Sequence, residues 1–255
     1  MLITIPEESF AYGFIVNGMG AHASRTIMLS ELQLLLTSVA VSAHPEDYQT
    51  AIIEQNVVLK STEVTRRETF RRLRALYGLD SEILLFRALR DLWDLQPEAQ
   101  PMLALLCAIA RDPLLRATAN VVMSTPVGVE VTAAAISKVV DEHFNGRYNP
   151  IAPAIGRRAA SSWQQSGHLQ GRLKKIRSIP PFGPTSTAYG LFLGYLCGAR
   201  GDGLFDTFWS NLLCAPLHTL HDLAVSAAKQ GWLEYKHSGN VTEITFRHLM
   251  RDKLE

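Results

Sequence analysis

The stretch from His143 to Gly201 constrains the fold most, because it carries many cations and contains no Asp or Glu. Within it, residues 154–166 are predicted to form an amphipathic helix, which Gly167 ends. The apolar stripe of this helix consists of Ile155, Ala159 and Trp163. A short, strongly basic segment follows the glycine. Helix, stop and basic segment follow the order of a winged helix-turn-helix, in which a wing comes after the recognition helix.

Two groups of polar side chains in this stretch are candidate contacts to nucleic acid. Arg, Ser and Gln can bind phosphates and the base edges of a major groove. On the predicted recognition helix, such side chains are Arg157, Arg158, Ser161, Gln164 and Gln165. On the predicted wing, the cations expected to hold the DNA backbone are Arg172, Lys174, Lys175 and Arg177. The alternative interpretation is an ordinary surface helix followed by a basic loop.

A second cationic segment lies nearer the N-terminus. Thr65 and Glu68 have the spacing of a capping box, which predicts a helix that starts near Arg66 and stops at Gly78. Its buried stripe is expected to contain Phe70, Leu73 and Tyr77, and its cationic face Arg66, Arg67, Arg71 and Arg74. This face is either a second phosphate-binding patch or simply a solvated helix surface.

The C-terminal region repeats the order of helix and hairpin with much less positive charge. Residues 217–231 predict a helix, and residues 232–246 alternate apolar and polar around Ser238-Gly239-Asn240, which indicates a β-hairpin. The chain is therefore predicted to be mostly α, a helical bundle with helix-turn-helix or winged-helix units and short β-hairpin wings. The expected division is an N-terminal helical domain (1–130) and a C-terminal winged-helix-like region (131–255). Within the latter, residues 131–180 are the basic unit and residues 185–255 a structural or protein-contact unit.

Composition narrows the function classes. The net charge is +1 and 47% of the residues are hydrophobic, but no apolar run is long enough to cross a bilayer. The start of the chain lacks the pattern of a secretory signal. Three widely spaced cysteines indicate reduced thiols, so a cytoplasmic location without membrane contact is expected.

Motifs of catalysis are missing from the sequence. The chain has no phosphate-binding GxxxxGK[ST] motif, no GxSxG motif and no CxxC pair. Cys214, His218 and His221 have a spacing at which a metal is conceivable, but Pro216 interrupts the helix that would join them. The sequence therefore predicts a binding protein, with no cofactor and no metal, rather than an enzyme.

A family resemblance rests on one further run of residues. This run is Asn56-Val-Val-Leu-Lys60-Ser61-Thr-Glu-Val-Thr65-Arg-Arg, and it continues into Arg72-Leu73. It resembles the N-terminal signature of the BrxA family of BREX phage-defence systems. That signature is an Asn, a basic–Ser pair, a Thr and an Arg-rich helix with an Arg-Leu. The resemblance covers roughly residues 10–180. It implies a small, mostly helical, non-enzymatic DNA-binding protein that acts beside a methyltransferase, an ATPase and a phosphatase-like partner.

These observations together predict a protein that binds double-stranded DNA mainly through phosphates, with weak sequence preference. Its expected partners are duplex DNA and other defence-system proteins, and its oligomeric state is open. One alternative is a winged-helix transcriptional regulator, which would need a dimer and a palindromic site. Another is a protein-interaction scaffold whose basic face docks an acidic partner. RNA remains a further alternative, because phosphate attraction alone does not distinguish it from DNA.

Overall fold

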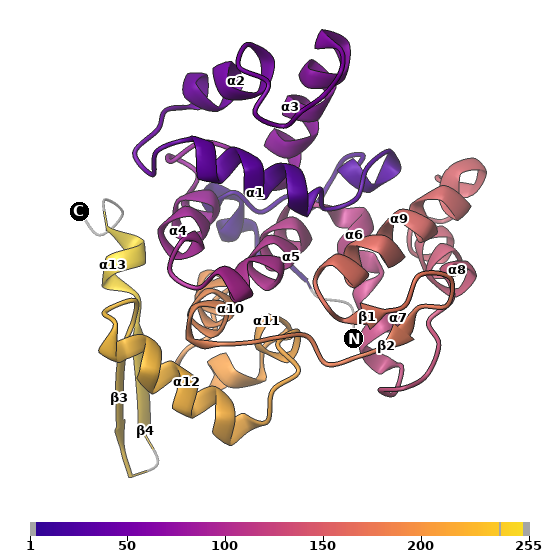
Figure 1. The fold of residues 1–255 in the computed structure, drawn as a ribbon. Coiled ribbons are helices and arrows are strands. Elements are labelled where there is room, and N and C mark those ends of the chain that lie inside the picture. The colour runs from indigo at the N-terminus through magenta and orange to yellow at the C-terminus, as the bar shows by residue number, and fades with distance from the viewer. Residues whose placement is uncertain (1–3, 240, 252–255) are drawn as a thin grey trace.

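Residues 4–239 and 241–251 are described by the computed structural model, which is mostly helical with two small antiparallel hairpins (Figure 1). The N-terminal elements are η1 (Glu7–Tyr12), η2 (Ala21–Ala23), α1 (Leu29–Ser38), α2 (Pro45–Ile53), α3 (Glu63–Tyr77) and α4 (Leu84–Trp93). The central elements are η3 (Pro97–Ala99), α5 (Gln100–Arg111), α6 (Pro113–Ala117), α7 (Ala119–Ser124), α8 (Ala133–His143), η4 (Asn149–Ile151), α9 (Ala152–Gln165), β1 (Leu169–Gln170) and β2 (Ile176–Arg177). The C-terminal elements are α10 (Pro184–Leu196), η5 (Gly201–Asp206), α11 (Phe208–Asn211), α12 (Leu217–Lys229), β3 (Glu234–Ser238), β4 (Val241–Thr245) and α13 (Arg247–Met250). The predicted content of helices and hairpins is confirmed.

Helix α5 is the centre of the core. Every residue from Met102 to Arg111 is buried, as expected for a helix that is apolar on all sides. It packs against α3, α4, α6, α9 and α10, and in Figure 1 it lies in the middle of the molecule. One cluster of buried apolar side chains runs from Ile5 to Met250. Through α5, the core connects both cationic helices, α3 and α9.

Helix α3 begins earlier than the sequence indicated. Its N-cap is Thr62, whose Oγ1 accepts a hydrogen bond from the backbone N of Thr65 at 3.2 Å. The predicted cap at Thr65 was therefore wrong by about one turn, because threonines stand at both positions and Glu63 supports the earlier start by pairing with Arg67. The predicted C-terminal stop is confirmed, since Gly78 has a positive φ of 96° and its N–H bonds to the carbonyl of Arg74.

Helices α8 and α9 cross closely at a glycine. A Cβ on Gly156 would lie 2.4 Å from the carbonyl oxygen of Ala133 and 2.3 Å from Oγ of Ser137. The hydrogen atom of glycine is what allows this approach. The predicted apolar stripe of α9 is confirmed, and it is buried completely: Ile155, Ala159 and Trp163.

After α9 the chain forms the hairpin of β1 and β2, in which Leu169 pairs with Arg177 and Gln170 with Ile176. A third segment, residues 128–131, pairs with the other edge of β2. The backbone N of Gly128 donates to the carbonyl of Arg177 at 2.9 Å, and the N of Val131 to that of Lys175 at 2.8 Å. The pairing of β2 on both edges holds the hairpin against the segment that precedes α8.

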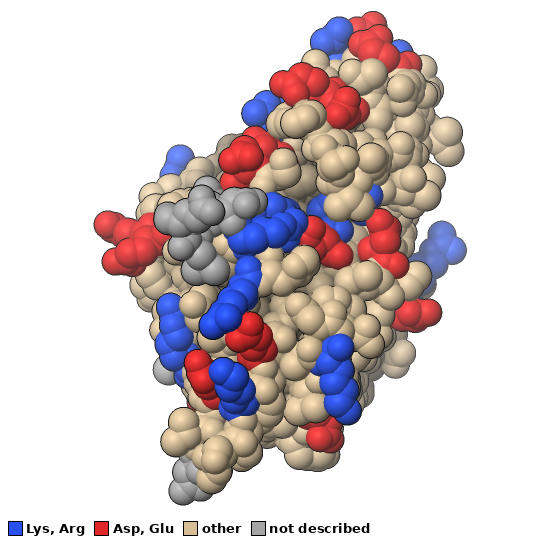
Figure 2. All heavy atoms as spheres, turned by 90° about the vertical axis from the view of Figure 1, so that its left-hand side faces the viewer, with Lys and Arg blue, Asp and Glu red and all other residues tan. Residues whose placement is uncertain are grey.

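The predicted C-terminal hairpin is confirmed, and it is formed by β3 and β4. Glu234 pairs with Thr245 and Ser238 with Val241, whereas Asn240, part of the predicted turn, lies outside the described residues. Figure 2 shows the side of the molecule that carries α13 and this hairpin, where cationic and acidic residues are interspersed. No helix of the described ranges combines the length and the apolar character needed to span a membrane.

Candidate nucleic-acid interface

The predicted contacts on α9 and after it fall into three classes of exposure. Arg157, Arg172 and Lys174 are exposed. Arg158, Ser161, Gln164, Gln165 and Lys175 are half-buried, and Arg177 is buried. Among the described residues, none of the three exposed cations has an acidic partner. They are the groups best placed to meet a phosphate.

Arg177 does not lie where the sequence suggested. It is only 4% exposed, and its guanidinium donates to the carbonyls of Val122 at 3.1 Å, His168 at 3.2 Å and Ser178. It also contacts Sγ of Cys214 at 3.0 Å. Arg177 therefore fastens the base of the hairpin to α7 and to the C-terminal region. A guanidinium engaged in this way cannot hold a DNA backbone, so this expected contact is corrected.

His168, the residue before β1, holds the base of the β1–β2 hairpin at the β1 strand, as Arg177 does at β2. Burial lowers its pKa to about 3, so the ring is neutral at physiological pH. Its Nε2 donates to the carbonyl of Leu212 at 2.8 Å, and its Nδ1 lies 2.9 Å from Oγ of Ser166. The base of the hairpin is thus held by buried polar contacts on both strands.

Gln164 and Gln165 both accept hydrogen bonds through their side-chain oxygens. Oε1 of Gln164 accepts from Nζ of Lys175, which also donates to the carbonyl of Gly171 at 2.9 Å. Oε1 of Gln165 accepts from the backbone N of Leu29 at 3.2 Å. Partial burial lowers the pKa of Lys175. These contacts tie the last turn of α9 to the hairpin and to α1, and they leave the amide nitrogens of both glutamines as possible donors to a base.

Arg158 belongs to a cluster that also includes Arg25, a residue outside the predicted interface. Its guanidinium donates to the carbonyl of Ala23 at 2.5 Å. Its pKa is lowered, first by partial burial and then by the positive charges of Arg157 and Arg25. Arg25 follows η2, which packs against both α3 and α9. No local signal in the sequence marks Arg25, because it is a single cation in the loop after η2 and lies far from α9 in the sequence. A bound anion would relieve the repulsion among the three guanidinium groups.

We call Arg25, Arg157, Arg158, Arg172 and Lys174 the cationic surface. An acid adjoins this surface. Glu130 is exposed and pairs through its backbone with Ile176, two residues after Lys174. The stretch itself is free of acids, but the fold brings this glutamate to its edge from the segment before α8.

The second patch, on α3, is partly neutralised. Arg67 pairs with Glu63 at 2.5 Å, and Arg71 and Arg72 both pair with Glu68. The hydrogen bond and charge of Arg67 lower the pKa of Glu63. Burial works to raise the pKa of Glu68, but its hydrogen bonds with Arg72 and Arg71 and their charges lower it overall. Arg66 is half-buried, and Arg74 is exposed without an acidic partner among the described residues.

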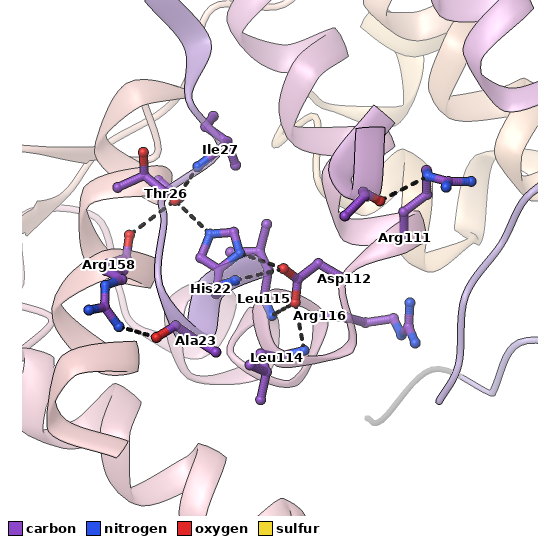
Figure 3. A network of polar contacts seen from close by, with 12 residues as sticks. His22, Ala23, Thr26, Ile27, Arg111, Asp112, Leu114, Leu115, Arg116 and Arg158 are labelled. Carbon is purple, nitrogen blue, oxygen red and sulfur yellow. Dashed lines mark hydrogen bonds and ion pairs between the residues drawn. The ribbon is translucent and has the colours of Figure 1, made fainter. Parts of the chain in front are cut away.

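A buried polar network anchors α9 to the rest of the protein (Figure 3). Nδ1 of His22 lies 2.8 Å from Oδ2 of Asp112, and Nε2 of His22 lies 2.7 Å from Oγ of Ser162. The same Oγ accepts from the backbone N of Ile27 at 3.0 Å and lies 3.0 Å from the carbonyl oxygen of Arg158. Asp112 also caps α6 by accepting from the backbone N of Leu114 at 2.9 Å. The network joins η2, α6 and α9.

The charge state of Asp112 follows from these contacts. Burial by itself raises the pKa of its carboxyl group, but the charge of His22 and the hydrogen bonds from His22 and from the N–H of Leu115 lower it overall. The order Asp, His, Ser is that of a hydrolase triad. Here, however, the side chains are 0–1% exposed and Oγ of Ser162 is surrounded by protein partners, so a substrate has no access to it.

The residues weighed as a metal site do not converge. Sγ of Cys214 accepts from Arg177, whereas His221 stacks on Phe205 with ring centroids 3.9 Å apart and bonds to the hydroxyl of Tyr235 at 2.9 Å. Across the described ranges, no group of three or more His, Cys, Asp or Glu side chains is arranged to hold a metal ion. Cys107, Cys197 and Cys214 are free thiols.

Comparison with known proteins gives no match: no protein-family model and no curated protein sequence matches the chain. The similarity to the BrxA family therefore stays a prediction that rests on residues 56–73.

Proposed function

We propose that the protein binds double-stranded DNA, with α9 as a recognition helix in the major groove and the β1–β2 hairpin as a wing. The element order supports this proposal. Helix α7, the paired segment 128–131, α8, α9, β1 and β2 follow one another as in a winged helix-turn-helix. The elements from α10 to β4 repeat the order of helices followed by a hairpin, and we propose that this second unit is structural or contacts another protein and does not bind the DNA.

The observation that carries the proposal is the cationic surface. Its three exposed members come from α9 and from the loop between β1 and β2, and none of them is neutralised by an acid in the described part of the chain. Elsewhere several exposed cations are paired with acids, as in the pairs of Lys236 with Glu243 and Arg247 with Glu234. On α3 the exposed Arg67 and Arg71 are paired too, and Arg74 stands without an acidic partner among the described residues. Unpaired cations on two adjoining elements attract a polyanion and release its counterions.

Sequence preference is expected to be weak. Ser161 and the amide nitrogens of Gln164 and Gln165 are the groups on α9 suited to reading base edges, and both glutamines are already held by protein contacts. Most of the binding free energy would therefore come from phosphate contacts, which position a protein on DNA without reading its sequence.

The cellular role is proposed from the family resemblance. A DNA-binding component without catalytic groups fits an anti-phage defence system in which partner proteins supply the enzymatic steps. A transcriptional regulator would use the same surface, but as a dimer on a palindromic site. Measuring the mass of the protein–DNA complex separates these two roles.

The test is a fluorescence titration of a duplex of about 30 base pairs at several salt concentrations. Four or five phosphate contacts give a slope of log affinity against log salt of about −4. The variant Arg157→Ala/Arg172→Ala/Lys174→Ala should flatten that slope to about −1.3. A matched control is Lys229→Ala/Lys236→Ala/Arg247→Ala, which removes three exposed cations from the C-terminal region and should leave the slope unchanged.

Two results would contradict the proposal. One is no binding to duplex DNA even at low salt, which would favour the scaffold that docks an acidic protein. The other is an equal loss of affinity in the control variant, because binding would then follow the total charge and not this surface. Double-stranded RNA of the same length serves as competitor, and preference for it would favour the RNA alternative.

A further inference from the structure

The loop between β1 and β2 exposes one leucine at its tip. Leu173 is 94% exposed, more than any other large apolar side chain of the described residues. Its neighbours in the chain, Arg172 and Lys174, are also exposed. A leucine in this position gains nothing from packing, and a polar residue would be more soluble there.

The tip is a braced turn. Gly171 has a positive φ of 97°, and a Cβ on it would lie 2.3 Å from the carbonyl oxygen of Lys174, so this position requires glycine. Nζ of Lys175 donates to the carbonyl of Gly171 at 2.9 Å and also to Gln164 on α9. Below the turn, Arg177 fixes the strand to α7. The three side chains of residues 172–174 therefore project from a support that is tied to α9.

A single apolar side chain between two cations suits the minor groove of DNA. Proteins that bend DNA insert such side chains between two base pairs from the minor groove, while flanking cations hold the phosphates. A single leucine buries too little apolar surface to hold a protein or a membrane by itself, whereas one wedge is enough to unstack a base step. Because the turn is linked to α9, DNA bound by that helix would present a minor groove to the hairpin.

We propose that Leu173 is a wedge that enters the minor groove and kinks the duplex, with Arg172 and Lys174 on either side of it. This inference rests on the proposed binding of DNA. It assigns to the protein a DNA-bending activity and a source of selectivity, because pyrimidine–purine steps such as TA unstack more easily than others. Selectivity would then come from the flexibility of the DNA and not from hydrogen bonds to bases.

The experiment measures binding and bending separately. A duplex of about 20 base pairs with one central TA step carries a donor and an acceptor dye at its ends, so that a kink of about 20–90° shortens their distance. Wild-type protein at saturation should raise the energy transfer, and more so than on a duplex with a GC step in the same place. Leu173→Ala should bind about tenfold more weakly and give no bend at saturation, with the salt slope unchanged because no charge is removed.

Two further variants complete the test. Leu173→Met keeps an apolar side chain of similar length and should retain the bend. Val241→Ala removes an apolar side chain, 70% exposed, beside the turn of the other hairpin and should change nothing. Binding by wild-type protein without bending, or bending by Leu173→Ala equal to wild type, would overturn the wedge and leave DNA binding intact. Absence of any binding by wild-type protein would overturn both proposals.

Discussion

Nε2 of His22 lies 2.7 Å from Oγ of Ser162, and this contact connects the N-terminal segment to the C-terminal half of α9. Ser162 is four residues after Arg158, whose guanidinium binds the carbonyl of Ala23, next to His22. Two adjacent residues of η2 therefore hold one turn of α9. The orientation of that helix, and with it the spacing of Arg157 and Arg158 from Arg25, depends on a buried imidazole.

Replacing His22 should destabilise the protein strongly. His22→Ala leaves the carboxylate of Asp112 buried without its side-chain hydrogen-bond partner, which costs about 3 kcal/mol in the free energy of unfolding. Urea unfolding followed by circular dichroism measures this change. His218→Ala, at an exposed position, is the control and should differ from wild type by about 0.5 kcal/mol at most. A loss for His22→Ala as small as that of the control would mean that the network does not hold α9.

The contribution of Asp112 to stability should depend on pH. Its pKa in the folded protein lies below the value of about 3.9 in an unfolded chain. The stabilisation is therefore complete above that pH and is lost as the pH falls through the folded pKa. Asp112→Asn, which keeps an oxygen to cap α6, should be less stable than wild type at pH 7, and the difference should shrink below about pH 4. A difference that stays constant down to pH 3 would contradict this assignment.

Local patterns explain which parts of the site could be predicted from the sequence. The spacing of Ile155, Ala159 and Trp163 determines the buried side of α9, and Gly167 with a positive φ of 86° ends it. Both hairpins also follow from short-range signals. Such features depend on residues within one or two turns of each other, so that periodicity and turn chemistry are sufficient.

What could not be predicted depends on contacts between distant segments. Arg177 looks like the neighbouring cations in the sequence, and only the packing of the hairpin against α7 and the C-terminal region buries its side chain. Arg25 and His22 come to α9 from the N-terminal segment, and Asp112 comes from the start of α6. None of these three carries a motif, because their roles arise from packing around α5.

Glu130 should weaken DNA binding in the wild-type protein. It lies at the edge of the cationic surface, where its charge repels phosphate. Glu130→Gln removes that repulsion and should raise the affinity about threefold at low salt, an effect that disappears as salt screens the charges. Glu130→Lys should raise it further and steepen the salt slope by about 0.9 if the new ammonium group meets a phosphate. Glu243→Gln, an exposed acid on the other hairpin, is the matched control. Equal effects at both positions would show that only net charge matters.

Two arginines of the hairpin should behave in opposite ways. Arg177→Ala removes hydrogen bonds to buried carbonyls and should lower the free energy of unfolding by about 3 kcal/mol. The protein that remains folded should keep the wild-type salt slope, because Arg177 is buried.

Arg172→Ala should leave the unfolding free energy within about 0.5 kcal/mol of wild type, since its side chain is exposed, but should reduce the salt slope by about 0.9. Unfolding curves and salt titrations of both variants check the pair. A reduced slope in Arg177→Ala at full folding would show that the hairpin opens on DNA and that this guanidinium leaves its buried site to bind phosphate.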